Sequence, residues 1–495
     1  MKHRIFSAVI CAALILSALA SCADSNEKDP IVDPTETKEA EKDVPVFEEA
    51  DLGGRTITFV CYPDDTDWFP DNYIDNDEMN GEPMNDAVIE RNDRVKEKYN
   101  CEIVKRQIEG PAAYTSTASK SGTVDFDITY DWGTRLSEGI LEGLYYDLNS
   151  VDYVDLSQSY WAPSTHEDLT VADKLCLFTN DITMNRLGYS YLLVFNKTLI
   201  ERYNLETPYD LVEQNRWTFD KYFEMIKDIH EDVNGNTESD AEDIFGADVC
   251  NVGMALDCAG MPLDYVVKNE DGSYKLNVYT EKLVQIYNEY AAKIEISEGV
   301  FRGFCDEYDS SLYKNPEQQV RKTGFGSGHL VFMAVYMAYT EDFCEMTDDY
   351  GVVPYPKYND AQQEYYSFIE PYAPMFGIVR QSPSLDDIGI VLEYMAYESE
   401  NLLLPAFYEQ TIKNKRMNDE RDDKMLDIVR DTAHYITYRV YERGGKDGEW
   451  EPISGMLSDM LSSGNFGSVN KKYKDTAQQW LNDFYDSMLT LDLNK

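Results

Sequence analysis

One long apolar run, at the N-terminus, limits what this chain can fold into. Basic side chains at positions 2 to 4 precede it, and residues 5 to 19 are mostly apolar and carry no charge. About fifteen residues are too few to span a bilayer comfortably, but they fit the apolar region of a secretory signal. No later apolar run is long enough to cross a membrane. We therefore expect the rest of the chain to fold outside the bilayer.

The apolar run ends in Leu19-Ala20-Ser21-Cys22, which resembles the lipobox of bacterial lipoproteins. In signals of that class the Cys thiol receives a diacylglyceryl group, and the chain is cut just before it. The resemblance implies a signal peptide over residues 1–21, lipidation of Cys22 and an extracytoplasmic protein anchored to the outer face of the cell membrane. Each buried CH₂ of an acyl chain contributes about 0.8 kcal/mol to anchoring. An ordinary signal peptide with a chance Cys, or a signal anchor, is the alternative.

The segment after the signal differs in composition from the body. Residues 22–46 are polar, charged and interrupted by prolines. Such a segment buries too little apolar surface to offset the entropy of ordering, so we expect a disordered acidic linker. The body beyond it has about 450 residues, more than one ordinary hydrophobic core holds. Two lobes or domains are expected.

Charge and cysteine content exclude several classes of function. The formal net charge is −48, from 92 acidic against 44 basic side chains, so nucleic acid is not an expected partner. No Cys-x-x-Cys pair and no pair of His at ligand spacing occurs, which excludes a zinc ribbon and a redox motif. We expect a monomer without a cofactor, and mostly buried free thiols, with a disulfide or two left open. The cysteines outside the signal and the lipobox are Cys61, Cys101, Cys176, Cys250, Cys258, Cys305 and Cys344.

The hydrophobic pattern of the first part of the body alternates between strand and helix. Residues 55–61 read as a buried strand, and Val88, Asn92, Val95 and Tyr99 form one stripe of a helix. Strands are expected again from 101 to 104 and from 125 to 130, and then a helix from 136 to 144. This order favours an α/β fold with mainly parallel strands.

Further along, residues 191–196 (YLLVFN) predict another buried strand, and Thr218 can cap a helix. Short strands are expected at 351–354 and 376–379. Ser384 with Asp387 is a capping-box signature ahead of a helix, and a last helix is expected over 477–488.

Several short motifs, in this order, resemble the extracellular solute-binding proteins of ABC transporters, in their maltose-binding-like group. They are Phe126-Asp127-Ile128 followed by Asp131-Trp132, Tyr191 to Lys197, Leu205-Glu206-Thr207-Pro208, Trp217-Thr218-Phe219-Asp220, and Gly351 to Lys357. The resemblance covers most of residues 55 to 495. It implies an α/β, two-lobed, periplasmic-binding-protein-like (type II) fold with a ligand cleft between the lobes. The expected divisions are lobe 1 over 47–188 and 373–410, lobe 2 over 189–372, and C-terminal helices over 411–495.

The same resemblance implies a function. A member of this group is the substrate-binding lipoprotein of an ABC importer: it captures a carbohydrate by lobe closure and delivers it to permease subunits in the membrane. A peptide or another solute is the main alternative ligand, and a surface glycan-binding lipoprotein without a transporter is a further one. Catalysis is not expected, because Gly324-Phe325-Gly326-Ser327-Gly328 lacks the first Gly of a nucleophile elbow and no phosphate-binding Gly-Lys-Ser/Thr loop occurs.

A sugar site needs flat aromatic faces together with carboxylate or amide acceptors, and loops that follow strands offer both. In the resembling family, the loops after the first strand and after Ile128 contact the ligand; the return segment and lobe 2 add aromatics. Packing in a core for Trp132 and helix capping for Asp131 are the alternatives. The candidate ligand-binding residues are Asp64, Asp65, Trp68, Asp131, Trp132, Arg135, Asn180, Asp181, Tyr336 and Tyr372.

A second candidate site is a polar loop with oxygen-bearing side chains on alternate residues. This spacing is typical of Ca²⁺ loops, although Gly235 sits at the fourth position rather than at the sixth of the EF-hand pattern. A solvated Asn-Gly turn between helices is the alternative. The possible ligands of a structural Ca²⁺ are Asp232, Asn234, Asn236, Glu238 and Asp240.

Overall fold

The computed structural model describes residues 45–63, 73–249, 261–303, 309–313, 315–343, 345–414, 419–442 and 452–493. Residues Phe47–Lys495 form one structural unit, separate from Met1–Val46. The predictions for Cys22 and for Asp64, Asp65 and Trp68 lie outside the described residues. Among the described residues, no helix combines the length and the apolar character needed to span a membrane.

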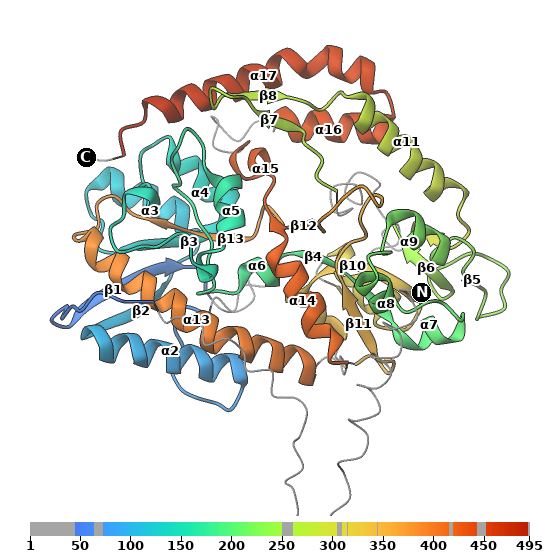
Figure 1. Ribbon diagram of the computed structural model, residues 1–495, viewed down its shortest axis with the longest axis horizontal. Helices are drawn as coiled ribbons and strands as arrows, with labels where there is room; N and C mark the ends of the chain where they lie inside the picture. Colours follow the sequence, from blue (N-terminus) through green and yellow to red (C-terminus); the bar gives the residue numbers. More distant parts are fainter. Residues whose placement is uncertain are drawn as a thin grey trace, which may run out of the picture. The chain divides into compact units, whose positions relative to one another are not determined.

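Lobe 1 is built on a four-stranded sheet in the order β13-β3-β1-β2 (Figure 1). The strands are β13 (Pro374–Ile378), β3 (Ile128–Trp132), β1 (Arg55–Cys61) and β2 (Cys101–Gln107). β1 pairs in parallel with β2 and β3, as the strand–helix alternation predicts, whereas β13 returns antiparallel to β3. The helices of this lobe are α2 (Pro83–Tyr99), α3 (Pro111–Ser121), α4 (Gly133–Ile140), α5 (Pro163–Leu169) and α13 (Leu385–Asn414).

Lobe 2 is built on a mixed sheet in the order β11-β4-β10-β6-β5, with β9 added beside β6. The strands are β11 (Tyr350–Val353), β4 (Tyr191–Asn196), β10 (Leu330–Tyr336), β6 (Ile244–Asp248), β5 (His230–Glu231) and β9 (Val300–Phe301). All six residues of β4 are buried, which explains their nearly continuous apolar character. The helices are α7 (Lys197–Arg202), α8 (Pro208–Glu213), α9 (Phe219–Ile226), α11 (Glu281–Ile296) and α12 (Pro316–Gln319).

Three segments pass between the two sheets, and they are hydrogen-bonded to one another. The first follows α6 (Asn185–Gly188) into β4, and Ser190 forms an antiparallel bridge with Ile369 of the second. The second contains β12 (Ser367–Phe368), which pairs in parallel with β14 (Ala433–His434) of the third. We call residues 189–191, 367–373 and 432–436 the crossing segments.

The C-terminal helices contact elements of both lobes. They are α14 (Arg421–Asp431), α15 (Thr437–Tyr441), α16 (Pro452–Ser463) and α17 (Phe466–Thr490), and α17 packs on the hairpin of β7 (Val266–Lys268) and β8 (Tyr274–Leu276). Near the end of α17 the Met488 carbonyl accepts a bond from Lys174 Nζ at 2.8 Å. At the end of α16 the Leu461 carbonyl accepts one from Tyr287 Oη of α11 at 2.6 Å.

The observed boundaries confirm most of the sequence pattern and correct one strand. The strand expected from 125 to 130 begins only at Ile128, because Asp127 has another role: its Oδ2 accepts the Thr58 N–H and its Oδ1 accepts bonds from Arg55 and Ser382. Thr218 caps α9, as expected. Cys61, Cys101 and Cys176, the cysteines among the described residues, are buried and form no disulfide.

Candidate functional site

The ends of β1 and β3 bring the candidates Trp132 and Arg135 together with Tyr62. Trp132 is the last residue of β3, and α4 begins directly after it, so Arg135 lies in the first turn of α4. The Arg135 guanidinium carbon is 3.9 Å from the centroid of the Trp132 ring, and the guanidinium donates a hydrogen bond to Tyr62 Oη. Because β1 and β3 are parallel neighbours, the loops at their carboxyl ends meet, which is the usual ligand position in open α/β sheets.

The return segment adds an aromatic side chain to this group. Tyr372 contacts Trp132 edge-on, with 5.4 Å between the ring centroids, and 37% of Tyr372 is exposed. Next to Trp132, Gly133 packs against Met375 of β13; a Cβ there would lie 2.7 Å from Met375 Sδ, so a larger residue would require the Met375 side chain to move. The candidates Trp132, Arg135 and Tyr372 are therefore brought together, and Trp132 is only partly buried.

Asp131 lies beside this group, but backbone N–H groups occupy its carboxylate oxygens. It is fully buried, its Oδ2 accepts the Ala112 N–H of α3 at 2.9 Å, and its Oδ1 accepts the Trp132 N–H at 2.7 Å. Arg135 lies 3.8 Å away, and burial raises the pKa of the Asp131 carboxyl to about 7. These contacts match the alternative interpretation, capping at a helix N-terminus. Direct ligand contact by Asp131 stays a prediction.

A carboxylate that sequence reasoning missed lies at the lobe 2 side of the crossing segments. Glu370 Oε2 accepts bonds from Tyr191 Oη at 3.1 Å and Tyr336 Oη at 3.2 Å, and the Tyr372 N–H lies 3.4 Å from its other oxygen. The two phenol oxygens are 2.8 Å apart, and Tyr339 packs against Tyr336 at 5.2 Å between ring centroids. Burial raises the pKa of Glu370 above its usual range.

These contacts connect the aromatic group of lobe 1 with the tyrosines of lobe 2 in one cluster. We call Tyr62, Trp132, Arg135, Tyr191, Tyr336, Glu370 and Tyr372 the aromatic–carboxylate cluster. It offers flat rings, phenol hydroxyls, a guanidinium and a carboxylate. Rings stack on the apolar face of a sugar, while the polar atoms exchange hydrogen bonds with its hydroxyls. The signal for Glu370 was a single acid in the otherwise apolar segment Phe368-Ile369-Glu370-Pro371.

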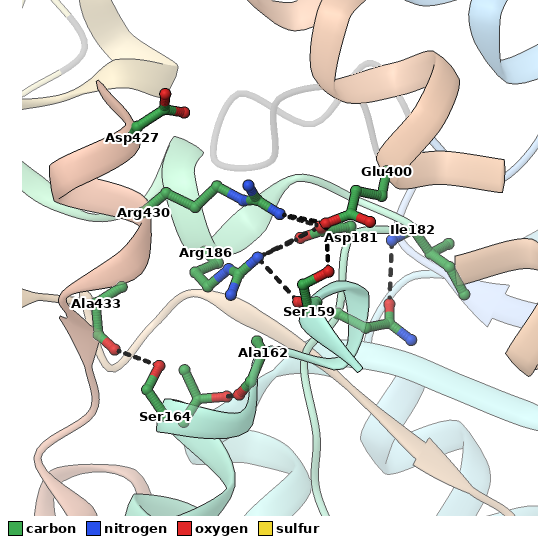
Figure 2. A network of polar contacts seen from close by, with 12 residues as sticks. Ser159, Ala162, Ser164, Asp181, Ile182, Arg186, Glu400, Asp427, Arg430 and Ala433 are labelled. Carbon is green, nitrogen blue, oxygen red and sulfur yellow. Dashed lines mark hydrogen bonds and ion pairs between the residues drawn. The ribbon is translucent and has the colours of Figure 1, made fainter. Parts of the chain in front are cut away.

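Asn180 and Asp181 lie in a different environment, a buried polar network shown in Figure 2. Asn180 is fully buried and its Oδ1 accepts the Ile182 N–H at 3.1 Å. Asp181 is 2% exposed, and its oxygens accept bonds from Arg186 at 3.0 and 3.3 Å and from Arg430 at 2.9 Å. A carboxylate held by two guanidiniums is unavailable to a ligand unless these bonds break. The contacts indicate a structural role, and ligand binding by this pair stays a prediction.

The proposed Ca²⁺ loop uses its side-chain oxygens internally. Asp232 accepts the Gly235 and Thr237 N–H groups at 2.6 and 2.9 Å, and Asp240 accepts the Asn236 side-chain amide at 2.6 Å. Such bonds are typical of Asx turns and leave fewer lone pairs for a cation. Among the described residues, no group of three or more His, Cys, Asp or Glu side chains is arranged to hold a metal ion. Ca²⁺ binding to Asp232, Asn234, Asn236, Glu238 and Asp240 stays a prediction.

Comparison with known proteins yields a likeness of fold. The sequence matches no protein-family model and no curated protein. A cyclo/maltodextrin-binding protein complexed with maltotetraose is 14% identical and aligns with a TM-score of 0.53, over 88% of this chain and 98% of that one. RafE from Streptococcus pneumoniae, in its apo form, is 10% identical with a TM-score of 0.49 over 88% and 98%. A solute-binding protein of an ABC transporter from Thermotoga lettingae, bound with α-D-tagatose, is 12% identical with a TM-score of 0.49 over 86% and 100%. The chain therefore has the two-lobed α/β fold of the maltodextrin-binding protein.

Proposed function

We propose that this chain is the substrate-binding lipoprotein of an ABC importer, which captures a sugar or oligosaccharide between its lobes and delivers it to a membrane permease. The observation that supports this proposal best is the aromatic–carboxylate cluster. Trp132 belongs to lobe 1, Tyr191 and Tyr336 belong to lobe 2, and Glu370 and Tyr372 lie on a crossing segment between them. A ligand bound at the cluster would contact both lobes and would stabilise one relative orientation of the two.

The ligand class follows from the chemistry of the cluster. Its charged groups already have partners within the protein: Arg135 lies on the Trp132 ring near Asp131, and Glu370 accepts bonds from two phenols. A neutral, hydroxyl-rich ligand can add to such a cluster without bringing an uncompensated charge. The maltotetraose held by the cyclo/maltodextrin-binding protein is a ligand of this kind.

Binding is tested by thermal melting of the chain from residue 23 onward, which omits the lipidated Cys22, against a panel of sugars and a panel of peptides. A ligand at 100 times its Kd adds about 2.7 kcal/mol to the free energy of unfolding, so a true ligand gives a clear rise in Tm. We expect an oligosaccharide to raise Tm and no peptide to do so. A rise with peptides alone would overturn the proposed ligand class.

The site is tested in the same assay with Trp132→Ala. Loss of the stacking ring should weaken sugar binding by about tenfold or more, since ring contacts contribute about 0.5–1.5 kcal/mol beyond the area they bury. Tyr153→Ala, which removes a half-exposed aromatic of lobe 1 outside the cluster, is the matched control and should bind as the wild type does. Equal affinity of the two variants would place the ligand elsewhere.

The proposed location, on the outer face of the cell membrane, depends on Cys22. Cys22→Ser should release the protein from the membrane fraction and abolish incorporation of labelled fatty acid, because the thiol is the acyl acceptor in the lipobox mechanism. Release without loss of sugar binding is the expected combination. A variant that stays membrane-bound would argue against the lipid anchor.

A further inference from the structure

Figure 2 shows a buried group of four charged side chains, none of which belongs to the aromatic–carboxylate cluster. Asp181 pairs with Arg186 at 3.0 Å and with Arg430 at 2.9 Å, and Arg430 also pairs with Glu400 at 3.1 Å. The exposed fractions of these side chains range from 3% for Asp181 to 11% for Arg430. Two cations and two anions cancel, and Ser159 Oγ completes the group by donating to Glu400 at 2.6 Å.

Arg430 comes from a helix that is held by lobe 2. It lies in the last turn of α14. In the first turn of α14, Asp422 Oδ1 accepts bonds from Tyr209 Oη of α8 at 2.5 Å and from the Val352 N–H of β11 at 3.2 Å. Arg421 pairs with Asp210 of α8 at 3.0 Å. These bonds tie α14 to the lobe 2 sheet and to the helix beside it.

Both carboxylates of the group come from segments held by lobe 1. Glu400 belongs to α13, which packs along α2; next to it, Glu398 pairs with Arg94 of α2 at 2.8 Å. Asp181 precedes the first crossing segment, and its N–H donates to the Tyr160 carbonyl at 3.0 Å. Tyr160 in turn donates to Glu393 of α13 at 2.6 Å. Arg430 therefore joins α14 to two separate segments of lobe 1.

We propose that Arg430 is a latch that holds α14 of lobe 2 against α13 of lobe 1 and so sets how much of the protein adopts the arrangement seen in the structure. A rotation of lobe 2 about the crossing segments that carries α14 away from α13 separates Arg430 from Asp181 and Glu400. It would leave one of these buried carboxylates without its cation, and an uncompensated buried charge is costly. The latch thereby favours one member of the conformational ensemble over the others.

The inference goes beyond sugar binding and does not depend on it, because all four partners belong to the protein. The two ideas can therefore fail separately. A chain that binds no sugar still has a measurable distribution of lobe orientations, and a chain without a latch can still bind sugar.

The test measures the distance between the lobes in the ligand-free mature protein by single-molecule energy transfer. Dyes are attached through unnatural amino acids at position 102 in β2 and position 224 in α9, whose native Glu side chains are 61% and 68% exposed. This labelling leaves the native cysteines unmodified. Wild type, Arg430→Met and Arg94→Met are compared, because Arg94 also pairs with an acid of α13 but entirely within lobe 1.

We expect the wild type and Arg94→Met to share one distance distribution. Arg430→Met should lower the ratio of the arrangement seen in the structure to one with α14 rotated away from α13 by about tenfold or more. Arg430→Lys should restore part of the wild-type distribution. If Arg430→Met does not fold, Glu400→Gln, which keeps the shape of the side chain and removes its charge, takes its place and should change the ratio in the same direction by less. Distributions that coincide for folded wild-type and latch variants would overturn the proposal.

Discussion

The buried charged side chains Asp181, Arg186, Glu400 and Arg430, which we call the latch group, and the aromatic–carboxylate cluster both contain arginine and a carboxylate, but they differ in how the carboxylates are satisfied. In the latch group, Asp181 accepts bonds from two guanidiniums and Glu400 accepts one. In the cluster, Glu370 accepts hydrogen bonds from two phenols and lies next to a backbone N–H, all neutral donors, while Arg439 acts on its pKa from further away. A hydroxyl of a ligand can replace a phenol at little cost, whereas nothing neutral can replace a guanidinium in a buried ion pair. The ion pairs of the latch group therefore suit a structural contact, and the neutral hydrogen bonds of the aromatic–carboxylate cluster suit a binding site.

The largest effect that separates the two regions is expected from Asp181→Asn. The change leaves Arg186 and Arg430 buried beside a neutral amide, and removal of one partner from a buried pair costs about 3–5 kcal/mol. Urea unfolding followed by circular dichroism measures the loss. Asp125→Asn is the control, because its pair with Arg106 is exposed and contributes about 0–1 kcal/mol. A loss no larger than that of the control would mean that the latch group adds little stability.

Glu370→Gln in the aromatic–carboxylate cluster should change sugar affinity strongly and the free energy of unfolding only slightly. The phenols of Tyr191 and Tyr336 can still donate to the amide oxygen, so the free energy of unfolding should change by less than about 1 kcal/mol. Sugar binding should weaken by about tenfold, since a hydrogen bond to a charged group contributes about 1.5–3 kcal/mol. Isothermal titration calorimetry on the wild type and on Glu370→Gln measures the difference in sugar affinity. A stability loss without a binding defect would make Glu370 a structural residue like Asp181.

A pH series sharpens the comparison for Asp131, whose carboxyl is fully buried and lies 3.8 Å from Arg135 Nη1. Burial raises its pKa from 3.8 to about 7, so between these values the folded protein binds more protons at this site than the unfolded chain does. The contribution of Asp131 to stability is therefore greatest at low pH and falls as pH rises from 4 to 7. Asp131→Asn should lose this part of the pH dependence, and its Tm should fall less than that of the wild type over the same range. Parallel Tm profiles would show that Asp131 keeps an ordinary pKa.

The smallest effect is expected at the loop of residues 232–240, where the oxygens already accept N–H groups of the loop. If Ca²⁺ replaces these donors, millimolar CaCl₂ should raise the free energy of unfolding over EGTA by about 1 kcal/mol. Asp240→Asn should remove the rise. Identical melting in CaCl₂ and in EGTA would leave the loop as a hydrogen-bonded turn.

The sequence predicts elements well where the periodicity of one segment determines them. The strands at 55–61 and 191–196 are observed at those residues, because β-branched, aromatic and other apolar residues dominate both runs. Trp132 and Tyr372 were separate candidates, from the family motif after the third strand and from the expected return near residue 372; their contact depends on the pairing of β13 with β3. Asp131 could be assigned to a helix cap or to a ligand, and only the position of α3 distinguishes these.

The ion pairs of the latch group could not be predicted from the pattern of any one segment. Its partners are up to 249 residues apart, and nothing local distinguishes Arg430 or Glu400 from other charged residues on helices. Asp181 looked like a ligand residue because it precedes a crossing segment. Its saturation by two arginines depends on tertiary packing, which the pattern of a single segment does not contain.

The return of β13 to the sheet of lobe 1 has a consequence for the order in which the chain acquires its structure. All strands of the lobe 2 sheet lie within one continuous stretch, from Tyr191 to Val353, whereas the lobe 1 sheet joins Ile128–Trp132 to Pro374–Ile378. Pairing over such a separation is slow, because a long loop must close before the contacts form. As the chain is synthesised from its N-terminus, the edge of β3 that pairs with β13 stays unpaired until the strands of lobe 2 have been synthesised. The sheet whose first strand is synthesised first is therefore the sheet that is completed last.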